Sequence, residues 1–271
     1  MWGRSLNRSY RTLFVPMIGC FAMLLATFLS SNGFAASNSW SITRNGDILE
    51  IAYGSGTSFP QYAALHLDSS YFRMNYGPES GWGTSVILLP SFWTGGNYYQ
   101  GAPIEVKYTR RGKNLLLKFN GTISGLDVRG TVYLYPPREN QISAMVSVRV
   151  RGNAVLDNRP GEAFKPVMLS SMHIDDDNWD VQSAYIDSQS FQIPSEGWII
   201  NPPALSNIFG LEGGTSSWKT NAPTIEIDLD REMQITGWVT SSDDPNDDNV
   251  GMWAASDRVL RSWRYTIIAK P

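Results

Sequence analysis

Three alternating carboxylates near the C-terminus have a spacing that could serve catalysis. Glu226, Asp228 and Asp230 alternate with isoleucine and leucine in the segment 225–230. Because successive side chains of a β-strand point to opposite faces, a strand here would carry all three carboxylates on one face. Two carboxylates can act as the acid and the nucleophile of glycoside hydrolysis. An ordinary half-buried strand with a polar outer face has the same pattern, so both interpretations stand.

Two known families have similar residues in this region. The order Glu-Ile-Asp-Leu-Asp at 226–230 resembles the E-I-D-x-E strand of laminarinase- and lichenase-type endoglucanases, where the two glutamates are nucleophile and acid/base. Asp230 replaces the second glutamate, and its shorter side chain makes the separation of about 5–5.5 Å in a retaining pair harder to reach. The span from Gly214 to Gly237 resembles the middle of a discoidin-type galactose-binding sandwich, which implies a structural role for Trp218. Both resemblances imply a carbohydrate-type β-sandwich.

His173 is a further candidate for acid–base catalysis. It lies in the predicted strand Val167–Ile174, directly before an acidic loop whose carboxylates would raise its pKa. The other histidine, His66, lies in the apolar strand Ala63–Leu67 and is predicted to be a partly buried structural residue. The chain has two histidines, one cysteine and no Gly-x-Ser-x-Gly motif, which argues against a histidine-rich metal site and a serine hydrolase.

Two acidic loops, 175–180 and 243–249, predict calcium binding. The candidate ligands are Asp175, Asp177, Asp180, Asp243, Asn246 and Asp248. Calcium takes about six to eight oxygen ligands, which clustered Asp, Asn and backbone carbonyls can supply. Neither loop has the EF-hand spacing, and a solvated acidic turn would have the same composition.

Aromatic residues beside Gly, Pro or acidic residues predict a carbohydrate-binding surface. Sugars present apolar C–H faces that stack on aromatic rings, and hydroxyl groups that polar side chains bind. The candidates, all in segments predicted as loops, are Trp82, Trp93, Tyr98, Tyr99, Trp179 and Trp198. Trp238 and Trp263 lie within apolar strands and are predicted to belong to the core.

The N-terminus has the pattern of a secretory signal peptide. Arg4, Arg8 and Arg11 precede the apolar run Leu13–Leu29, which small residues follow. We expect residues 1–35 to be removed, although an uncleaved anchor is the alternative. Residues 36–271 then contain no cysteine and no membrane span. Export without disulfides favours a secreted or cell-envelope protein of bacterial type.

Composition and turn signals predict one all-β domain. The chain has 271 residues, 42% hydrophobic and 17% charged, and a formal net charge of −3, which argues against a nucleic-acid partner. Strand patterns with hairpin turns recur throughout, and Ile104–Val150 resembles a four-stranded meander. Two short helices are predicted, at Ala204–Phe209 and Ala254–Leu260. The pattern favours a jelly-roll or a large antiparallel sandwich of two sheets.

Three functions fit these features. The first is a secreted β-sandwich that binds carbohydrate or a cell-surface glycan through aromatic loops, with calcium as a possible cofactor. The second is a carbohydrate-active enzyme, a glycoside hydrolase or polysaccharide lyase, on the same scaffold. The third is a structural cell-envelope protein without a small ligand. An enzyme requires titratable groups that converge in a cleft, whereas a binding protein requires an aromatic platform.

Overall fold

The chain forms an all-β structure. The computed structural model describes residues 39–54, 62–74, 84–138, 141–172, 181–213, 224–240 and 249–270, and every regular element within them is a β-strand. The strands are β1 (Trp40–Asn45), β2 (Ile48–Tyr53), β3 (Ala63–His66), β4 (Tyr71–Met74), β5 (Ser85–Ile87), β6 (Ser91–Thr94), β7 (Asn97–Tyr99), β8 (Ile104–Arg111), β9 (Asn114–Ile123), β10 (Leu126–Leu134), β11 (Ile142–Arg151), β12 (Phe164–Met172), β13 (Val181–Ile186), β14 (Gln189–Gln192), β15 (Gly197–Gly213), β16 (Thr224–Thr240), β17 (Asn249–Ser256) and β18 (Ser262–Lys270). Their pairings are antiparallel. The predicted all-β antiparallel class is confirmed.

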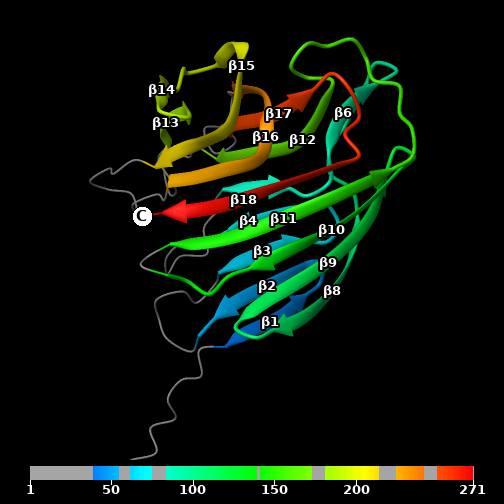
Figure 1. The fold of residues 1–271 in the computed structure, drawn as a ribbon, viewed down its shortest axis with the longest axis vertical. Coiled ribbons are helices and arrows are strands. Elements are labelled where there is room, and N and C mark those ends of the chain that lie inside the picture. The colour runs from blue at the N-terminus through cyan, green and yellow to red at the C-terminus, as the bar shows by residue number, and fades with distance from the viewer. Residues whose placement is uncertain are drawn as a thin grey trace, which may run out of the picture. The chain divides into compact units, whose positions relative to one another are not determined.

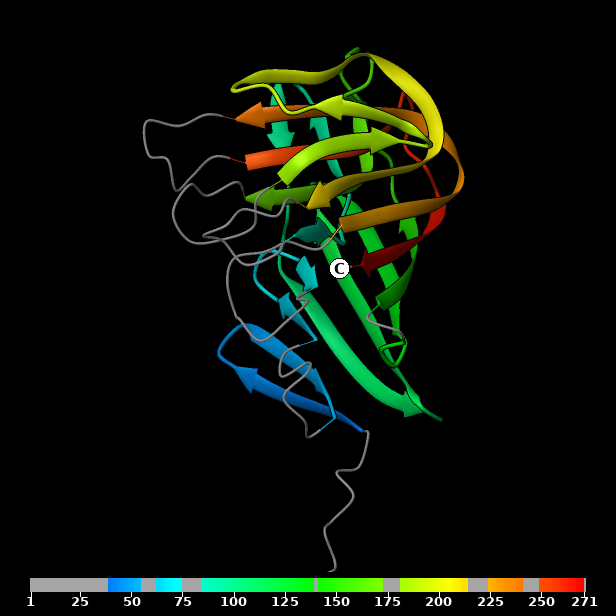
Figure 2. The same cartoon turned by 90° about the vertical axis from the view of Figure 1, so that its left-hand side faces the viewer.

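The strands lie in two layers, which we call layer A and layer B (Figure 1). Layer A runs β1–β2–β3–β4–β5–β12–β17, and the hairpin β6–β7 pairs with the same edge of β12 as β5. Layer B runs β8–β9–β10–β11–β18. Figure 2 shows the green strands of layer B on the right and the blue to cyan strands of layer A on the left.

Two long strands connect the layers. In β16, residues 224–229 pair with β18 of layer B, whereas residues 234–240 pair with β17 of layer A. β15 follows β16 along both halves, and register shifts after Trp198, Ile200 and Ser206 accompany its bend. A bulge bends a strand and increases its twist, which allows one hairpin to belong to both layers. β13 and β14 extend layer B beyond β15.

The core lies between the layers and follows from the alternation of apolar and polar residues. Ile225, Ile227 and Leu229 of β16 are buried, whereas the carboxylates between them lie on the outer face of layer B. Phe164 of β12 meets Trp263 of β18 edge to face, with 6.0 Å between the ring centroids. This aromatic contact joins the two layers at the core.

Tyr62 adds a polar connection between the layers. Its hydroxyl oxygen lies 2.8 Å from the carbonyl oxygens of Tyr135 and Ser143 and accepts the Ser143 N–H at 3.1 Å. Burial raises the pKa of Tyr62, so the phenol stays protonated and donates. The buried hydroxyl is therefore satisfied, as the interior of a protein requires.

The predicted hairpins and meander are confirmed. β1 and β2 flank Gly46, whose φ is 59°, and β8 and β9 flank Gly112, whose φ is 60°. Glycine adopts a positive φ without a steric cost, which explains both turns. The predicted meander from Ile104 to Val150 is the consecutive pairing of β8, β9, β10 and β11.

Both predicted helices are wrong. Ala204–Phe209 lies within β15, and Ala254–Leu260 begins inside β17. Ala204–Phe209 pairs with β16, and residues 254–256 pair with β12 and β16, so the sheet satisfies backbone groups there and overrides a weak local helix preference. Residues 224–229 and 234–240 each have a strand pattern of their own, and the structure joins them as the two halves of β16.

Candidate functional site

The hairpin β6–β7 presents two of the predicted aromatic residues on the outer face of layer A. The prediction that Trp93, Tyr98, Tyr99 and Trp198 lie in loops is wrong, because the first three belong to the strands of this hairpin and Trp198 belongs to β15. Phe92 stacks on Tyr99 at 5.6 Å, on the buried side of the hairpin. Trp93 faces Tyr98 on the opposite side, with 5.0 Å between the ring centroids. The two-residue period of a strand thus separates Tyr98 from Tyr99.

The connection between β11 and β12, residues 152–163, holds this hairpin in place. The Gly96 N–H donates to Oδ2 of Asp157 at 3.0 Å, and the Asp157 N–H donates to the Trp93 carbonyl at 3.1 Å. The Arg159 guanidinium lies 3.7 Å from the centroid of the Trp93 ring. A cation above an aromatic face is attracted by the ring quadrupole, which orients the indole.

Three further tryptophans lie on the same outer face. Trp198 pairs with Trp238 across β15 and β16, and their ring centroids are 4.9 Å apart. The ring centroid of Trp253, in β17, lies 6.1 Å from that of Trp198. Gly251 pairs with Trp238 and leaves open space beside it, because a Cβ there would meet no atom closer than 3.9 Å.

Lys165 brings a positive charge among these rings. Its Nζ lies 3.9 Å from the centroid of Trp253 and 5.1 Å from that of Tyr98, and the residue is only 7% exposed. Trp253 is held by a hydrogen bond from Nε1 to the Gly161 carbonyl at 2.9 Å. Burial lowers the pKa of Lys165 to about 8, against the opposing effect of Glu162. Among the described residues, no oxygen accepts a hydrogen bond from this ammonium group.

These side chains surround a hollow of about 390 Å³, which we call the aromatic pocket. Its lining residues are Trp93, Tyr98, Gln100, Glu162, Lys165, Met168, Ser170, Trp238, Thr240, Gly251 and Trp253. A neighbouring hollow of about 330 Å³ shares Glu162 and reaches Trp198. An aromatic lining with a few polar groups is typical of small-ligand sites.

The structure brings together three of the six predicted aromatic residues. Trp93, Tyr98 and Trp198 surround the two hollows, whereas Tyr99 packs toward the core. Trp82 and Trp179 lie outside the described residues. The prediction that Trp238 belongs to the core is wrong, because its side chain is half-buried and lines the pocket.

Sequence reasoning also missed Trp253 and Lys165. In β17, Val250 and Met252 are fully buried in the core, and Trp253 alternates with them on the other face. This alternation could have predicted from the sequence that Trp253 lies on the outer face of the strand. No local pattern marks Lys165, which lies beside a register shift in β12.

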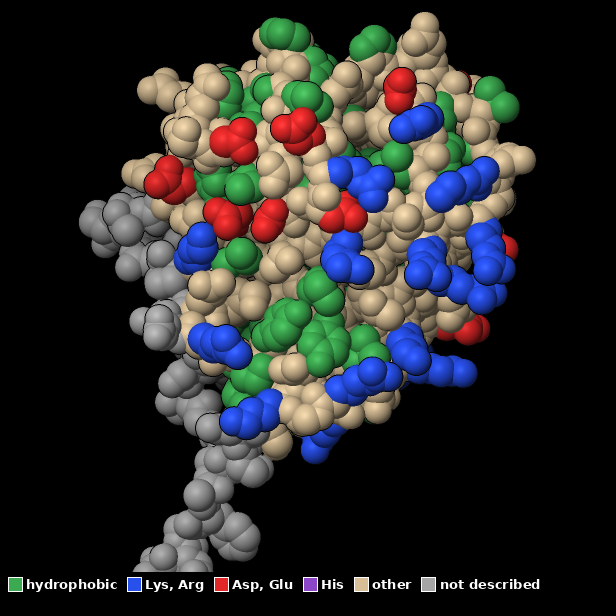
Figure 3. Space-filling model, viewed as in Figure 1, with side chains coloured by type: hydrophobic (Ala, Val, Ile, Leu, Met, Phe, Trp, Pro, Cys, Tyr) green, Lys and Arg blue, Asp and Glu red, His purple; other side chains and the backbone are tan. Residues whose placement is uncertain are grey.

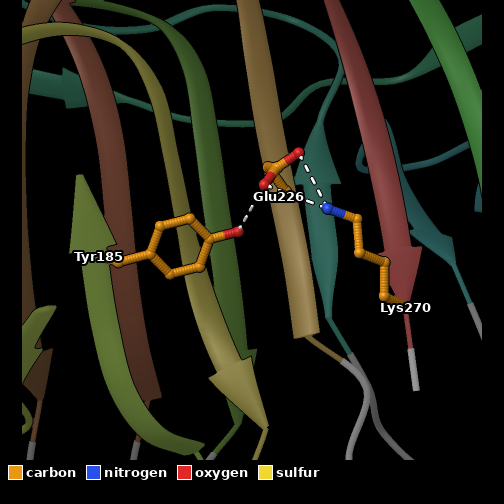
Figure 4. Close-up of polar contacts among 3 residues, drawn as sticks. All are labelled: Tyr185, Glu226 and Lys270. Carbon is orange, nitrogen blue, oxygen red and sulfur yellow. Dashed lines mark hydrogen bonds and ion pairs between the residues drawn. The ribbon is translucent and has the colours of Figure 1, made fainter. Parts of the chain in front are cut away.

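Glu226, the first of the alternating carboxylates, lies on the outer face of layer B. Its Oε2 accepts a hydrogen bond from the Tyr185 hydroxyl at 3.2 Å, and Lys270 Nζ lies 3.3 Å from Oε1 (Figure 4). A Cβ at Gly210 would lie 2.5 Å from the Tyr185 hydroxyl oxygen, so glycine leaves room for this phenol. Burial and the Glu226 charge raise the pKa of Tyr185, which therefore stays a hydrogen-bond donor.

The other carboxylates of this strand have partners of their own. Asp228 is exposed and accepts a hydrogen bond from Asn207 Nδ2 at 3.4 Å. Asp230 is exposed and pairs with Arg231 at 3.2 Å. His173 lies outside the described residues. The hydrogen bond from Tyr185 and the ion pair with Lys270 fix the orientation of the Glu226 carboxylate on the surface of the sheet.

The predicted calcium ligands, Asp175, Asp177, Asp180, Asp243, Asn246 and Asp248, all lie outside the described residues. So do the predicted leader at 1–35 and the cysteine within it. In the part of the chain that the structure covers, no group of three or more His, Cys, Asp or Glu side chains is placed to hold a metal ion. The described residues also contain no helix with the length and apolarity of a membrane span.

The comparisons with known proteins include a weak structural likeness to a solved structure. No family model and no curated protein matches the chain. The chain is similar to the protein of a solved structure titled "Crystal Structure of Heparinase III", at 10% sequence identity and a TM-score of 0.37. The similarity covers 87% of this chain and 36% of that chain.

Proposed function

We propose that this protein binds carbohydrate in the aromatic pocket. The observation that supports this function is the gathering of Trp93, Tyr98, Trp238 and Trp253 around a hollow that also contains Lys165. The rings offer stacking surface to the apolar face of a sugar. The ammonium group and Glu162 offer a donor and an acceptor to its hydroxyls. We also propose secretion or a cell-envelope location, on the basis of the leader at 1–35.

A steric block of the pocket tests this function. Gly251→Val places a branched side chain on the pocket floor, where a Cβ has room, and valine suits a strand better than glycine does. We expect binding to a panel of soluble oligosaccharides, measured by calorimetry, to fall at least about tenfold, while the melting temperature stays the same or rises.

Gly251→Ala is the matched control and should retain most of the binding. If no member of the panel binds the unaltered protein, or if Gly251→Val binds as well as the unaltered protein, the pocket is not the sugar site. The first of these results would favour a structural role in the cell envelope.

The charge of Lys165 predicts a pH dependence of binding. With its pKa lowered to about 8 from an ordinary 10.5, the ammonium donor is lost as the pH rises through about 8. We expect affinity to fall between about pH 7 and pH 9. The stability of the ligand-free protein has the opposite pH dependence. The unfolded chain keeps the Lys165 proton up to about pH 10.5, so the free energy of unfolding rises with pH between about 8 and 10.5. Lys165→Met should remove both slopes, and a binding slope that persists in this variant would contradict the assignment.

Calcium remains a proposal for the two acidic loops. If either loop binds the ion, millimolar calcium should raise the melting temperature by the mass-action relation between ligand concentration and stability. A matched titration with magnesium is the control. An unchanged melting temperature on addition of calcium or of a chelator would remove calcium from the proposed function.

A further inference from the structure

A second hollow, on the outer face of layer B, is rich in arginine. It has a volume of about 530 Å³ and lies over β10, β11 and β18, beside the bend of β16. We call it the arginine groove; its charged lining residues are Arg129, Arg149, Arg151, Arg264, Asp127 and Asp230. Figure 3 shows this face, with Lys and Arg side chains gathered on the right and Asp and Glu side chains toward the upper left.

The strand register forces like charges together in this groove. Arg129 of β10 lies directly opposite Arg149 of β11, and both side chains are exposed on the outer face. Side chains opposite one another in a sheet have Cβ atoms about 4.5–5.5 Å apart, and like charges there are destabilising. Arg151, two residues after Arg149, lies on the same face of β11 and faces Asp127.

The described residues do not neutralise these guanidinium groups. Within them, Arg129, Arg149, Arg151 and Arg264 form no ion pair, whereas Asp230 of the same groove pairs with Arg231. Asp127 accepts a hydrogen bond from Thr122 at 3.2 Å. The fold therefore maintains a local excess of positive charge, whose repulsion an anionic ligand would relieve.

The groove combines two kinds of recognition. A guanidinium group binds carboxylate or sulfate through two parallel hydrogen bonds. The carboxylates of Asp127 and Asp230 accept hydrogen bonds from hydroxyl groups. An acidic sugar has both acid groups and hydroxyl donors. A nucleic acid backbone offers acceptor oxygens that these carboxylates would repel, and the chain's pI of about 5.4 is far from the basic range of nucleic-acid-binding domains.

We propose that the arginine groove binds the acid groups of an acidic polysaccharide. The site is on the outer face of layer B, whereas the aromatic pocket is on the outer face of layer A. The inference therefore stands independently of the proposed function. Arg129 and Arg149 bind the acid groups, and the binding weakens as salt screens the charges.

The test uses the full chain with Arg129→Gln/Arg149→Gln and two anionic probes, polygalacturonate and dextran sulfate. Arg44→Gln/Arg111→Gln removes the same charge from exposed positions and is the matched control. Arg111 lies opposite Asn114 of β9, and Arg129 of the groove lies opposite Asn120 of the same strand. Six residues along a strand separate these two positions by roughly 20 Å. Neutral dextran and a single-stranded oligonucleotide complete the set of probes.

We expect the groove variant to bind at least one anionic probe at least about tenfold more weakly than the unaltered protein and the control variant do. The remaining affinity should depend less on salt. The groove substitutions should cause the same fold-loss of binding in a Gly251→Val background, which separates a failure of the groove from a failure of the pocket. Equal binding by the groove and control variants would overturn the proposal. So would a preference for the oligonucleotide, or a concentration-dependent dimer that the groove variant abolishes while glycan binding is absent.

Discussion

Replacing Trp263 with alanine is expected to lower the free energy of unfolding by about 3–5 kcal/mol. Trp263 is 2% exposed and packs edge to face against Phe164, which packs in turn against Phe92 at 6.1 Å. Its removal would leave a cavity where layer B meets layer A. The surrounding strands are hydrogen-bonded on both sides and collapse only partly into such a space. Urea denaturation monitored by circular dichroism measures the change.

Trp198→Ala is the control for this prediction. Trp198 is 41% exposed, so its removal deletes less buried surface and should cost much less than the core substitution. A loss of stability for Trp198→Ala as large as that for Trp263→Ala would show that the outer face of layer A is part of the core. That result would remove the basis for a ligand pocket there.

The double replacement Trp93→Ala/Trp198→Ala is expected to weaken carbohydrate binding about 100-fold. Trp93 lines the aromatic pocket, and Trp198 orients Trp238 and Trp253, which also line it. Loss of an aromatic anchor at a binding site often costs about 2 kcal/mol, and two partly coupled losses reach about 3 kcal/mol. Calorimetry with the best ligand of the oligosaccharide panel measures the change in Kd.

Two further variants distinguish a carbohydrate-binding protein from a carbohydrate-active enzyme. Tyr108 is 54% exposed on β8 of layer B, so Tyr108→Ala removes an exposed ring far from the pocket and should leave binding unchanged. Glu226→Gln keeps the shape of the side chain and should also leave a binding protein unchanged. If the protein degrades a polysaccharide and Glu226→Gln abolishes that activity, the carbohydrate-active enzyme replaces the binding protein as the function.

The alternation of side chains made much of the fold predictable. Turn glycines at positions such as Gly46 and Gly112 marked the hairpins, because few other residues adopt their backbone conformation at no cost. The same two-residue period placed Ile225 and Ile227 in the core and Glu226 on the surface. The period does not reveal which strands become neighbours, or that residues 224–240 form one strand shared by two layers.

The candidate site, like the fold, could be predicted only in part from the sequence. Local composition identified Trp93, Tyr98 and Trp198 as residues of interest, since each lies beside turn residues or on the outer face of a strand. Sequence by itself therefore determined the strand class, the turns and a set of aromatic candidates. Only the tertiary structure decided that Trp238, Trp253 and Lys165 join them, because pairing of β12, β16 and β17 brings distant segments to one face. Likewise, only the register of β10 and β11 sets Arg129 against Arg149, since cross-strand neighbours are fixed by hydrogen bonding and not by sequence spacing.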